Sequence, residues 1–263
     1  MNLTRFFALC AALVAGASSL ALSASAETPE QKGLAIARRV DTFNDGYKGE
    51  VSTMEMTLIN AHGDRTTRKL RSQQIEVAGD GDRSRIEFRW PADVKGTRML
   101  TWTRRKGNDD QWLFLPAIKR VKRISSGNKS GSFMGSEFAY EDLGSQEVDK
   151  YRHRFIAEEK LGGRATWKIE RVPVDSESGY KKLLTWIDQE YMQPLKIDYF
   201  DRKGELLKTA TFSGYEKQGK WFRPKTLSMV NHQTKKQSQL TWSERKLQVE
   251  LKAKEFESDE LDD

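Results

Sequence analysis

The chain has 263 residues, of which 32% are charged, and its formal net charge is +7 at pH 7. The 237 residues that follow a 26-residue leader favour one large β-rich domain over two, because sandwiches and barrels commonly reach roughly 200 to 250 residues. A basic protein of this kind suits anionic headgroups, lipopolysaccharide or acidic partners. The chain has no recognised nucleic-acid-binding motif, so nucleic acid is excluded as the expected ligand.

The first 26 residues have the composition of a secretory signal peptide. Arg5 precedes the apolar run Phe6–Leu22, and the small residues Ala24–Ala26 form a cleavage site. A retained anchor is the less favoured alternative, because the apolar run is short of the roughly 20 residues that span a bilayer. We therefore expect export to the periplasm and a mature chain that starts at Glu27. Cys10 is the only cysteine and lies in this leader, so the mature chain has no thiol and no lipid on cysteine.

An amphipathic helix is predicted to open the mature chain. Thr28 and Gln31 can form a capping box around Pro29, which fits the first helical turn. Apolar residues then recur at helical spacing as far as Phe43, and the sequence 44–46 (Asn-Asp-Gly) ends the pattern. Because this helix has a single apolar stripe, it must pack on another element.

Runs of alternating polar and apolar residues follow the helix and predict half-buried strands. The apolar members of two runs each share one face: Met54, Met56 and Leu58, then Ile86, Phe88 and Trp90. Turn sequences such as 61–64, 79–82 and 161–163 separate the runs and favour sequential antiparallel hairpins. Further strands are predicted at 97–105, 111–124, 153–158, 165–173, 181–188, 194–201, 205–215, 221–231, 237–243 and 247–256.

So many strands with one apolar side have to curl, because an open twisted sheet of that size leaves its apolar face uncovered. We therefore predict a mainly β, α+β fold: a curved antiparallel half-barrel meander covered by the N-terminal helix and a short central lid helix. A single domain is expected to span residues 27–256, and the acidic tail, residues 257–263, is predicted to be frayed.

The sequence does not favour an enzyme. The mature chain has no cysteine nucleophile, and its three histidines lie far apart. Gly131–Ser136 is not a G-x-S-x-G motif. Neighbouring carboxylates such as Glu141 and Asp142 point to opposite faces of a strand and do not face each other on a helix. We expect no catalytic residues, no metal and no cofactor, and an envelope hydrolase is the least favoured function.

The run Trp112–Leu115 breaks the alternation, so both faces of this strand are covered or one face meets a mobile apolar group. Four cations follow within five residues: Lys119, Arg120, Lys122 and Arg123. They have two interpretations. They form either a charged sheet edge that discourages aggregation, or a basic rim that engages a headgroup, an acidic partner or the membrane surface.

A Gly/Ser-rich stretch, 125–131, precedes a segment with large apolar side chains. Ser136 as cap and Gly144 beyond the end predict a short helix over 136–143. This segment is either a mobile lid over the curved apolar sheet or a permanent plug of the core. The candidate lid and cavity residues are Phe133, Met134, Phe138, Tyr140, Met54, Met56, Phe88, Trp90, Trp112 and Phe114.

The blocks Phe114–Ile124 and Ser132–Leu143 resemble the long central motif of the LolA-like family, the periplasmic outer membrane lipoprotein-sorting proteins. The order of an N-terminal helix and hairpins after a signal peptide is similar along most of the mature chain. The resemblance implies an incomplete antiparallel barrel with a helical lid over an apolar cavity that shields acyl chains. It also implies transport of hydrophobic molecules alongside inner-membrane exporters, and it carries over no catalytic residues.

We predict a periplasmic carrier or chaperone that binds a lipid, lipoprotein or other acylated molecule for transport to, or sorting at, the outer membrane. The alternative is a non-carrier envelope module, filled by its own side chains, that docks an inner-membrane exporter or an outer-membrane partner through the basic rim. A continuous apolar void beneath residues 132–143 favours the carrier, and a solid interior favours the module.

Overall fold

The computed structural model describes residues 26–262. Of the predicted signal peptide, 1–26, only Ala26 is among them, so that prediction lies outside the described residues. The helix α1 (Pro29–Asn44) forms as predicted. The Thr28 hydroxyl accepts a hydrogen bond from the Gln31 backbone nitrogen, and the Gln31 side chain accepts one from the Thr28 backbone nitrogen. The capping box therefore fixes where the helix begins.

Thirteen strands of the described chain form one antiparallel sheet in the order β6-β5-β4-β3-β2-β1-β15-β14-β11-β10-β9-β8-β7. The bounds are β1 Gly49–Ile59, β2 Arg65–Ile75, β3 Arg83–Trp90, β4 Arg98–Trp102, β5 Asp110–Leu115, β6 Arg120–Ile124, β7 Tyr151–Leu161, β8 Arg164–Pro173, β9 Tyr180–Asp188, β10 Gln193–Asp201, β11 Leu206–Ser213, β14 Thr226–Asn231 and β15 Gln237–Leu247. A separate two-stranded ribbon consists of β12 Glu216–Gln218 and β13 Trp221–Arg223.

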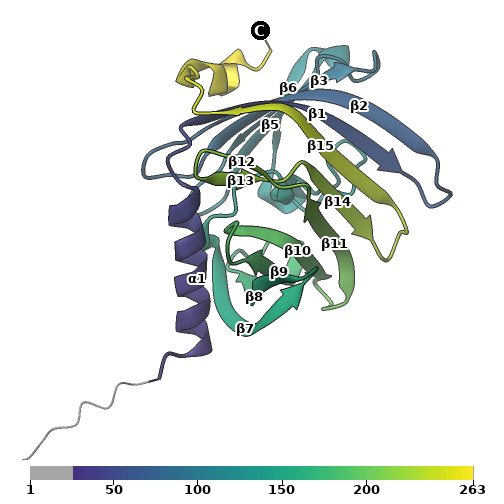
Figure 1. The fold of residues 1–263 in the computed structure, drawn as a ribbon. Coiled ribbons are helices and arrows are strands. Elements are labelled where there is room, and N and C mark those ends of the chain that lie inside the picture. Colours follow the sequence, from purple (N-terminus) through teal and green to yellow (C-terminus); the bar gives the residue numbers. More distant parts are fainter. Residues whose placement is uncertain (1–25, 263) are drawn as a thin grey trace, which may run out of the picture.

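The last strand joins the two halves of the meander. β15 pairs with β1 on one side and with β14 on the other, so all thirteen strands belong to one curled sheet (Figure 1). β6 and β7 are its free edges. The helix α1 packs along β7 and β8. The predicted antiparallel half-barrel with an N-terminal helix is confirmed.

Three of the predicted strands differ from the structure. The predicted strand 221–231 is interrupted at Pro224 and Lys225, so that its first part is β13 of the ribbon and its second part is β14 of the sheet. The predicted strand 111–124 is a hairpin in which β5 and β6 pair across the 3-10 turn η1 (Pro116–Ile118), and Lys119 is left-handed with φ 48°. Pro116 has no backbone N–H for a ladder, which is why the first strand stops there. The predicted strand 247–256 is wrong, since this stretch ends in the 3-10 turn η5 (Ala253–Phe256).

The two faces of the sheet carry separate hydrophobic clusters. The inner face of the curl bears the larger one, whose buried sheet residues include Met54, Met56, Leu70, Phe88, Met99, Leu113, Leu183, Ile197, Ala210, Met229 and Leu240. On the same face Ile36 of α1 joins Ile169 and Ile187 in a second cluster. The outer face of β4 and β5 bears a third cluster, which the end of the chain covers.

The acidic tail is packed rather than frayed. Phe256 and Leu261 are 0% and 1% exposed and share the outer cluster with Leu100 and Phe114. The 3-10 turn η6 (Ser258–Glu260) leads to Leu261, whose carbonyl accepts a hydrogen bond from the Arg98 guanidinium at 2.9 Å. The acidic composition of the tail gave no sign that Leu261, or Phe256 just before the tail, would be buried. Their burial corrects the prediction that the tail is frayed.

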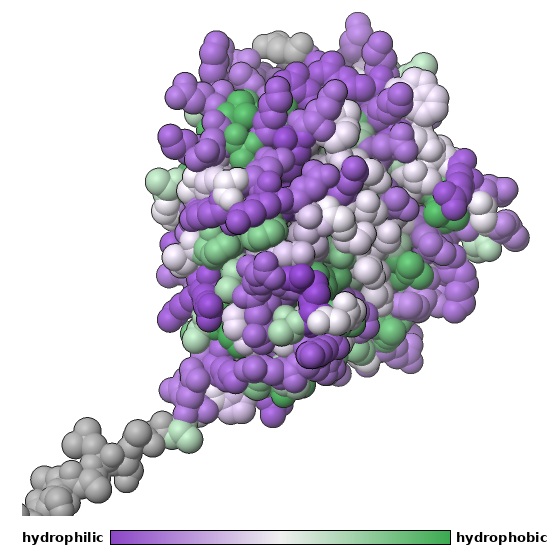
Figure 2. Space-filling model, in the orientation of Figure 1, coloured by the Kyte–Doolittle hydropathy of each residue, from purple (hydrophilic) through white to green (hydrophobic). Residues whose placement is uncertain are grey.

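The face of the molecule drawn in Figure 2 is largely hydrophilic. On this face, hydrophobic residues are scattered among polar ones. Within residues 26–262, no helix is long and apolar enough to cross a bilayer.

Candidate functional site

Residues 125–150, which we call the central segment, connect the free edges β6 and β7 and cross the inner face of the sheet. Figure 1 places part of this segment inside the curl. Its backbone forms three 3-10 turns, η2 (Ser126–Asn128), η3 (Tyr140–Asp142) and η4 (Val148–Lys150). The segment therefore lies where the resemblance implied a lid.

The helix predicted over 136–143 is wrong, because only the turn η3 forms. Met134 and Gly135 have φ of 50° and 75°. Two successive left-handed residues reverse the chain and cannot start a right-handed helix. The Ser136 hydroxyl, predicted as a helix cap, instead donates to the Phe133 carbonyl at 2.7 Å and closes this tight turn.

Two phenylalanines of the central segment point into the inner cluster. Phe133 and Phe138 are 0% and 2% exposed. The Phe133 ring centroid lies 5.8 Å from that of Phe88 and 5.9 Å from that of Tyr140, in tilted and edge-on arrangements that suit aromatic pairs. The segment thus fills the curl with its own side chains.

Seven of the predicted lid and cavity residues meet on the inner face: Met54, Met56, Phe88, Phe133, Met134, Phe138 and Tyr140. Two others were placed wrongly. Trp112 and Phe114 lie on the outer face, where Trp112 packs on Trp102 at a centroid distance of 5.0 Å. Strand alternation sends Leu113 inward and its two neighbours outward. Both faces of this strand are covered, as predicted.

Trp90 was also predicted to share the buried face of Phe88, and this is wrong. Its side chain is 51% exposed. It is the last residue of β3, and the pairing with β2 shifts between Lys69 and Leu70, so Trp90 lies beyond the inner cluster.

A buried ion pair fastens the central segment to the sheet. The Lys208 ammonium of β11 lies 2.6 Å from the Asp142 carboxylate, with side chains 4% and 6% exposed. The same ammonium donates to the Glu137 carbonyl at 2.9 Å, and the Tyr180 hydroxyl donates to Asp142 at 2.8 Å. A buried charge needs such partners, because desolvation is otherwise very costly.

Side chains of four further strands hold the central segment. Arg68 donates to the Met134 carbonyl at 2.6 Å, and Gln111 donates to the Tyr140 carbonyl at 2.8 Å. At Glu137, the carboxylate accepts from Asn231 at 2.7 Å and the backbone nitrogen donates to the Ser238 hydroxyl at 3.0 Å. In the part of the chain that the structure describes, backbone-to-backbone hydrogen bonds of residues 125–147 stay within the segment. The segment is therefore attached to the sheet without being one of its strands.

Glu141 is a second buried acid of the segment. Its carboxylate accepts hydrogen bonds from the Ser178 hydroxyl at 2.7 Å and the Gly179 nitrogen at 2.8 Å. Burial raises the pKa of Glu141 above its usual value, and the negative charge of Asp142 adds to the rise.

The polar anchors on the sheet were not predicted from the sequence. Two of these anchors, Lys208 and Arg68, could have been recognised from the strand pattern of the sequence. Lys208 alternates with Ala210 and Phe212, and Arg68 with Leu70, so each places a cation in the inward register of an apolar strand face. A lone cation in such a register indicates a buried partner.

The predicted basic rim lies on the edge strand β6 and the turn before it. Lys119, Arg120, Lys122 and Arg123 are all exposed. Arg123 pairs with Asp110 of β5. The position at a free edge agrees with both interpretations of these cations.

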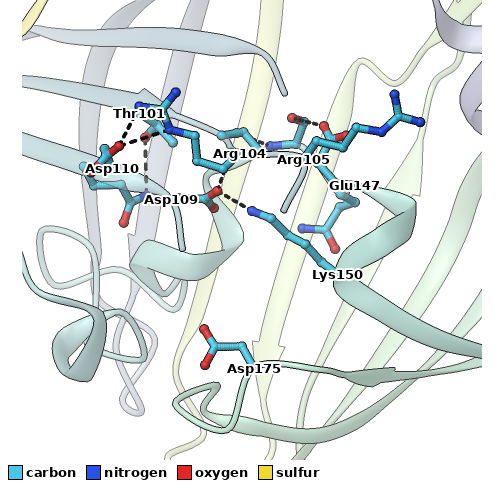
Figure 3. A network of polar contacts seen from close by, with 12 residues as sticks. Thr101, Arg104, Arg105, Asp109, Asp110, Glu147, Lys150 and Asp175 are labelled. Atoms are coloured by element: carbon cyan, nitrogen blue, oxygen red, sulfur yellow. Dashed lines mark hydrogen bonds and ion pairs between the residues drawn. The ribbon is translucent and has the colours of Figure 1, made fainter. Parts of the chain in front are cut away.

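Ion pairs tie the central segment to neighbouring loops, and Figure 3 shows one of them, between Lys150 and Asp109. Lys150 pairs with Asp109, and Lys129 pairs with Asp175. Nearby, the Arg104 guanidinium donates to Asp110 at 2.8 Å.

A cavity of about 330 Å³ lies between these ion pairs and is lined by both polar and apolar side chains, among them Ser126, Tyr151 and Val174. A second cavity, beside Arg104 and Arg105, is lined by charged groups as well. Neither is lined by residues 132–140, where apolar side chains fill the space. Among residues 26–262, no group of three or more His, Cys, Asp or Glu side chains is arranged to hold a metal ion.

Comparisons with known proteins agree with this architecture. A solved LolA superfamily protein from Nitrosomonas europaea is 20% identical with a TM-score of 0.69, covering 86% of this chain and 98% of its own, which supports the fold alone. A DUF1329 family protein from Desulfovibrio piger is 29% identical with a TM-score of 0.85, covering 89% and 99%. The fold is thus that of a LolA-like half-barrel.

A solved domain from Vibrio parahaemolyticus, described as an outer membrane lipoprotein-sorting protein domain, is 46% identical with a TM-score of 0.87. It covers 89% of this chain and 100% of its own. A family model described as an uncharacterized protein matches residues 80–263. No curated protein matches the chain. The chain belongs to the LolA-like family of outer membrane lipoprotein-sorting proteins, as the resemblance of its central motif indicated.

Proposed function

We propose that this protein is a periplasmic carrier that binds the acyl chains of a lipid, a lipoprotein or another hydrophobic molecule on the inner face of its sheet. Binding is non-covalent, with no catalytic residue, metal or cofactor. Family membership and the predicted signal peptide support this location and role. We further propose that the carrier receives its cargo from an inner-membrane exporter and delivers it to an outer-membrane acceptor.

One observation carries the proposal. The central segment fills the inner face, yet its backbone makes no ladder with the sheet in the described part of the chain. Displacing it costs side-chain contacts and leaves every strand pair intact. The apolar floor that it uncovers includes Met54, Met56, Met99 and Met229, whose flexible side chains adapt to tails of varied shape.

The free energy lost when the central segment leaves the inner face is similar in size to the free energy gained when an acyl chain binds there. Exposing Phe133 and Phe138 costs roughly 1.5 to 3 kcal/mol each, and each hydrogen bond to the sheet adds about 1 kcal/mol. Burying an acyl chain of about sixteen carbons gains about 12 kcal/mol, at ~0.8 kcal/mol per methylene. Cargo can therefore replace the segment, and the segment can in turn expel the cargo.

The filled interior favours a second candidate, the envelope interaction module. In that function the central segment is a permanent part of the core, and the basic rim on β6 docks an exporter or an outer-membrane partner. Crosslinking at Arg120 or Arg123 followed by pull-down tests it. A partner that survives charge reversal at both positions removes the reason for this candidate.

Native mass spectrometry and lipid extraction of the purified protein, together with competition against a fluorescent fatty acyl probe, test the carrier. We expect an apolar ligand to copurify, or the probe to bind and be displaced by unlabelled acyl chains. Protein that carries no ligand and binds no probe would support the module instead.

A further inference from the structure

One end of the sheet exposes apolar and basic side chains together. The loop between β3 and β4 (residues 91–97) lies against the turn η1 (Pro116–Ile118), because a Cβ at Gly96 would lie 3.6 Å from the Pro116 Cγ. We call this loop, this turn and the adjoining Trp90 the sheet tip. Successive hairpins of β3 to β6 bring these elements to the same end of the sheet.

The sheet tip carries two large exposed hydrophobic side chains. Trp90 is 51% exposed and Ile118 is 50% exposed. Scattered single apolar residues need no explanation, but an exposed tryptophan and isoleucine on two touching loops form a site of contact. Tryptophan is enriched at the level of lipid headgroups, where its ring is half in the apolar layer and half in water.

Five cations belong to these stretches of the chain. Lys69 lies opposite Trp90 across the strands, Arg89 precedes Trp90, Lys95 is in the loop, and Lys119 and Arg120 follow Ile118. The acids of this region are Asp93, Glu87, which pairs with Arg89 at 2.9 Å, and Glu55 of β1, which lies opposite Lys69 across the strands. Within residues 26–262, the other four cations make no ion pair with an acid. Cations outnumber acids at the sheet tip, which is therefore net positive and available for a negatively charged partner.

We infer that the sheet tip docks on an anionic lipid bilayer, with Trp90 and Ile118 at headgroup depth and the cations against the lipid phosphates. Each cation near such a surface contributes roughly 1 kcal/mol, and the exposed apolar groups add a short-range contact. Two residues before Trp90, the Phe88 ring packs on Phe133 of the central segment. Docking would bring the bilayer close to the segment that covers the inner face, although the inference does not depend on acyl cargo.

Flotation with phosphatidylcholine vesicles, with and without phosphatidylglycerol, tests the inference on the full mature chain. We expect binding only to the vesicles that contain phosphatidylglycerol, and weaker binding as salt rises. The substitutions Lys95→Glu and Arg120→Glu together should weaken binding roughly 30-fold or more. Trp90→Ser with Ile118→Ser should weaken it about tenfold.

Two control variants lie far from the sheet tip. Lys160→Glu in β7 with Lys203→Glu in the turn after β10 changes the net charge by the same amount at exposed positions, and Ile156→Ser removes a 42% exposed apolar side chain of β7. Both should float as the wild type does, and circular dichroism checks that all variants are folded. The inference is overturned if the wild type stays unbound with anionic vesicles, which would leave an acidic protein as the partner, or if control and tip variants lose equal affinity.

Discussion

Removing the Phe133 side chain should make the protein bind acyl chains more tightly. Phe133 is 0% exposed and contacts Phe88 and Tyr140 on the inner face. Phe133→Ala removes contacts that exist only while the central segment covers the sheet, at a cost to this covered form of about 3 kcal/mol. Opening becomes easier by the same amount, which corresponds to roughly 100-fold higher affinity for cargo.

Titration with a fluorescent fatty acyl probe measures this change, and thermal unfolding accompanies it. Phe256→Ala is the matched control, because Phe256 is also 0% exposed but lies on the outer face under the tail. Both variants should lose roughly 10 °C in Tm, and only Phe133→Ala should gain affinity. Equal affinity in the wild type and Phe133→Ala, or a gain shared by Phe256→Ala, would refute the reasoning.

Three further predictions concern the anchors of the central segment and the tail. Asp142→Asn leaves the Lys208 ammonium without its buried partner, at a cost of about 3 kcal/mol. Amide hydrogen exchange should become about 100-fold faster in the central segment and change little in the strands. The double change Asp142→Leu with Lys208→Met should restore much of the protection against exchange. Equally faster exchange in the segment and in the strands would argue against a segment that opens separately. Because burial raises the pKa of Glu141, its contribution to stability is complete below the usual 4.5 and is lost as pH rises through the higher folded value. Urea unfolding should therefore find Glu141→Gln gaining on the wild type as pH rises above 4.5, and a difference that stays constant with pH would contradict this. Leu261→Ala should lower the unfolding free energy by about 2 kcal/mol or more without changing probe affinity, whereas a frayed tail would give no loss.

Local signals in the sequence were sufficient for the sheet and the first helix. The capping box of Thr28 and Gln31 involves residues three apart, and the inward faces of Met54, Met56 and Phe88 follow from strand alternation. The family motif then indicated which connection crosses the inner face.

The details of the site depend on contacts between distant residues. Lys208 and Asp142 are 66 positions apart, so no short pattern reports their pairing. The left-handed conformation of Met134 and Gly135, which replaces the expected helix, is stabilised by the packing of Phe133 against Phe88 of the sheet. The packing of Leu261 likewise depends on an outer cluster formed by strands far earlier in the chain.

A reversible disulfide between the central segment and β15 tests the central claim most directly. The Ser238 hydroxyl lies 3.0 Å from the Glu137 nitrogen, which places the two residues close enough for Glu137→Cys and Ser238→Cys to be bridged in a chain whose only natural cysteine is Cys10. We predict that the oxidised protein binds no acyl probe, that reduction restores binding, and that Ser238→Cys alone binds in both conditions. Equal probe affinity of the oxidised and reduced double variant would show that the central segment does not have to leave, and would contradict the account.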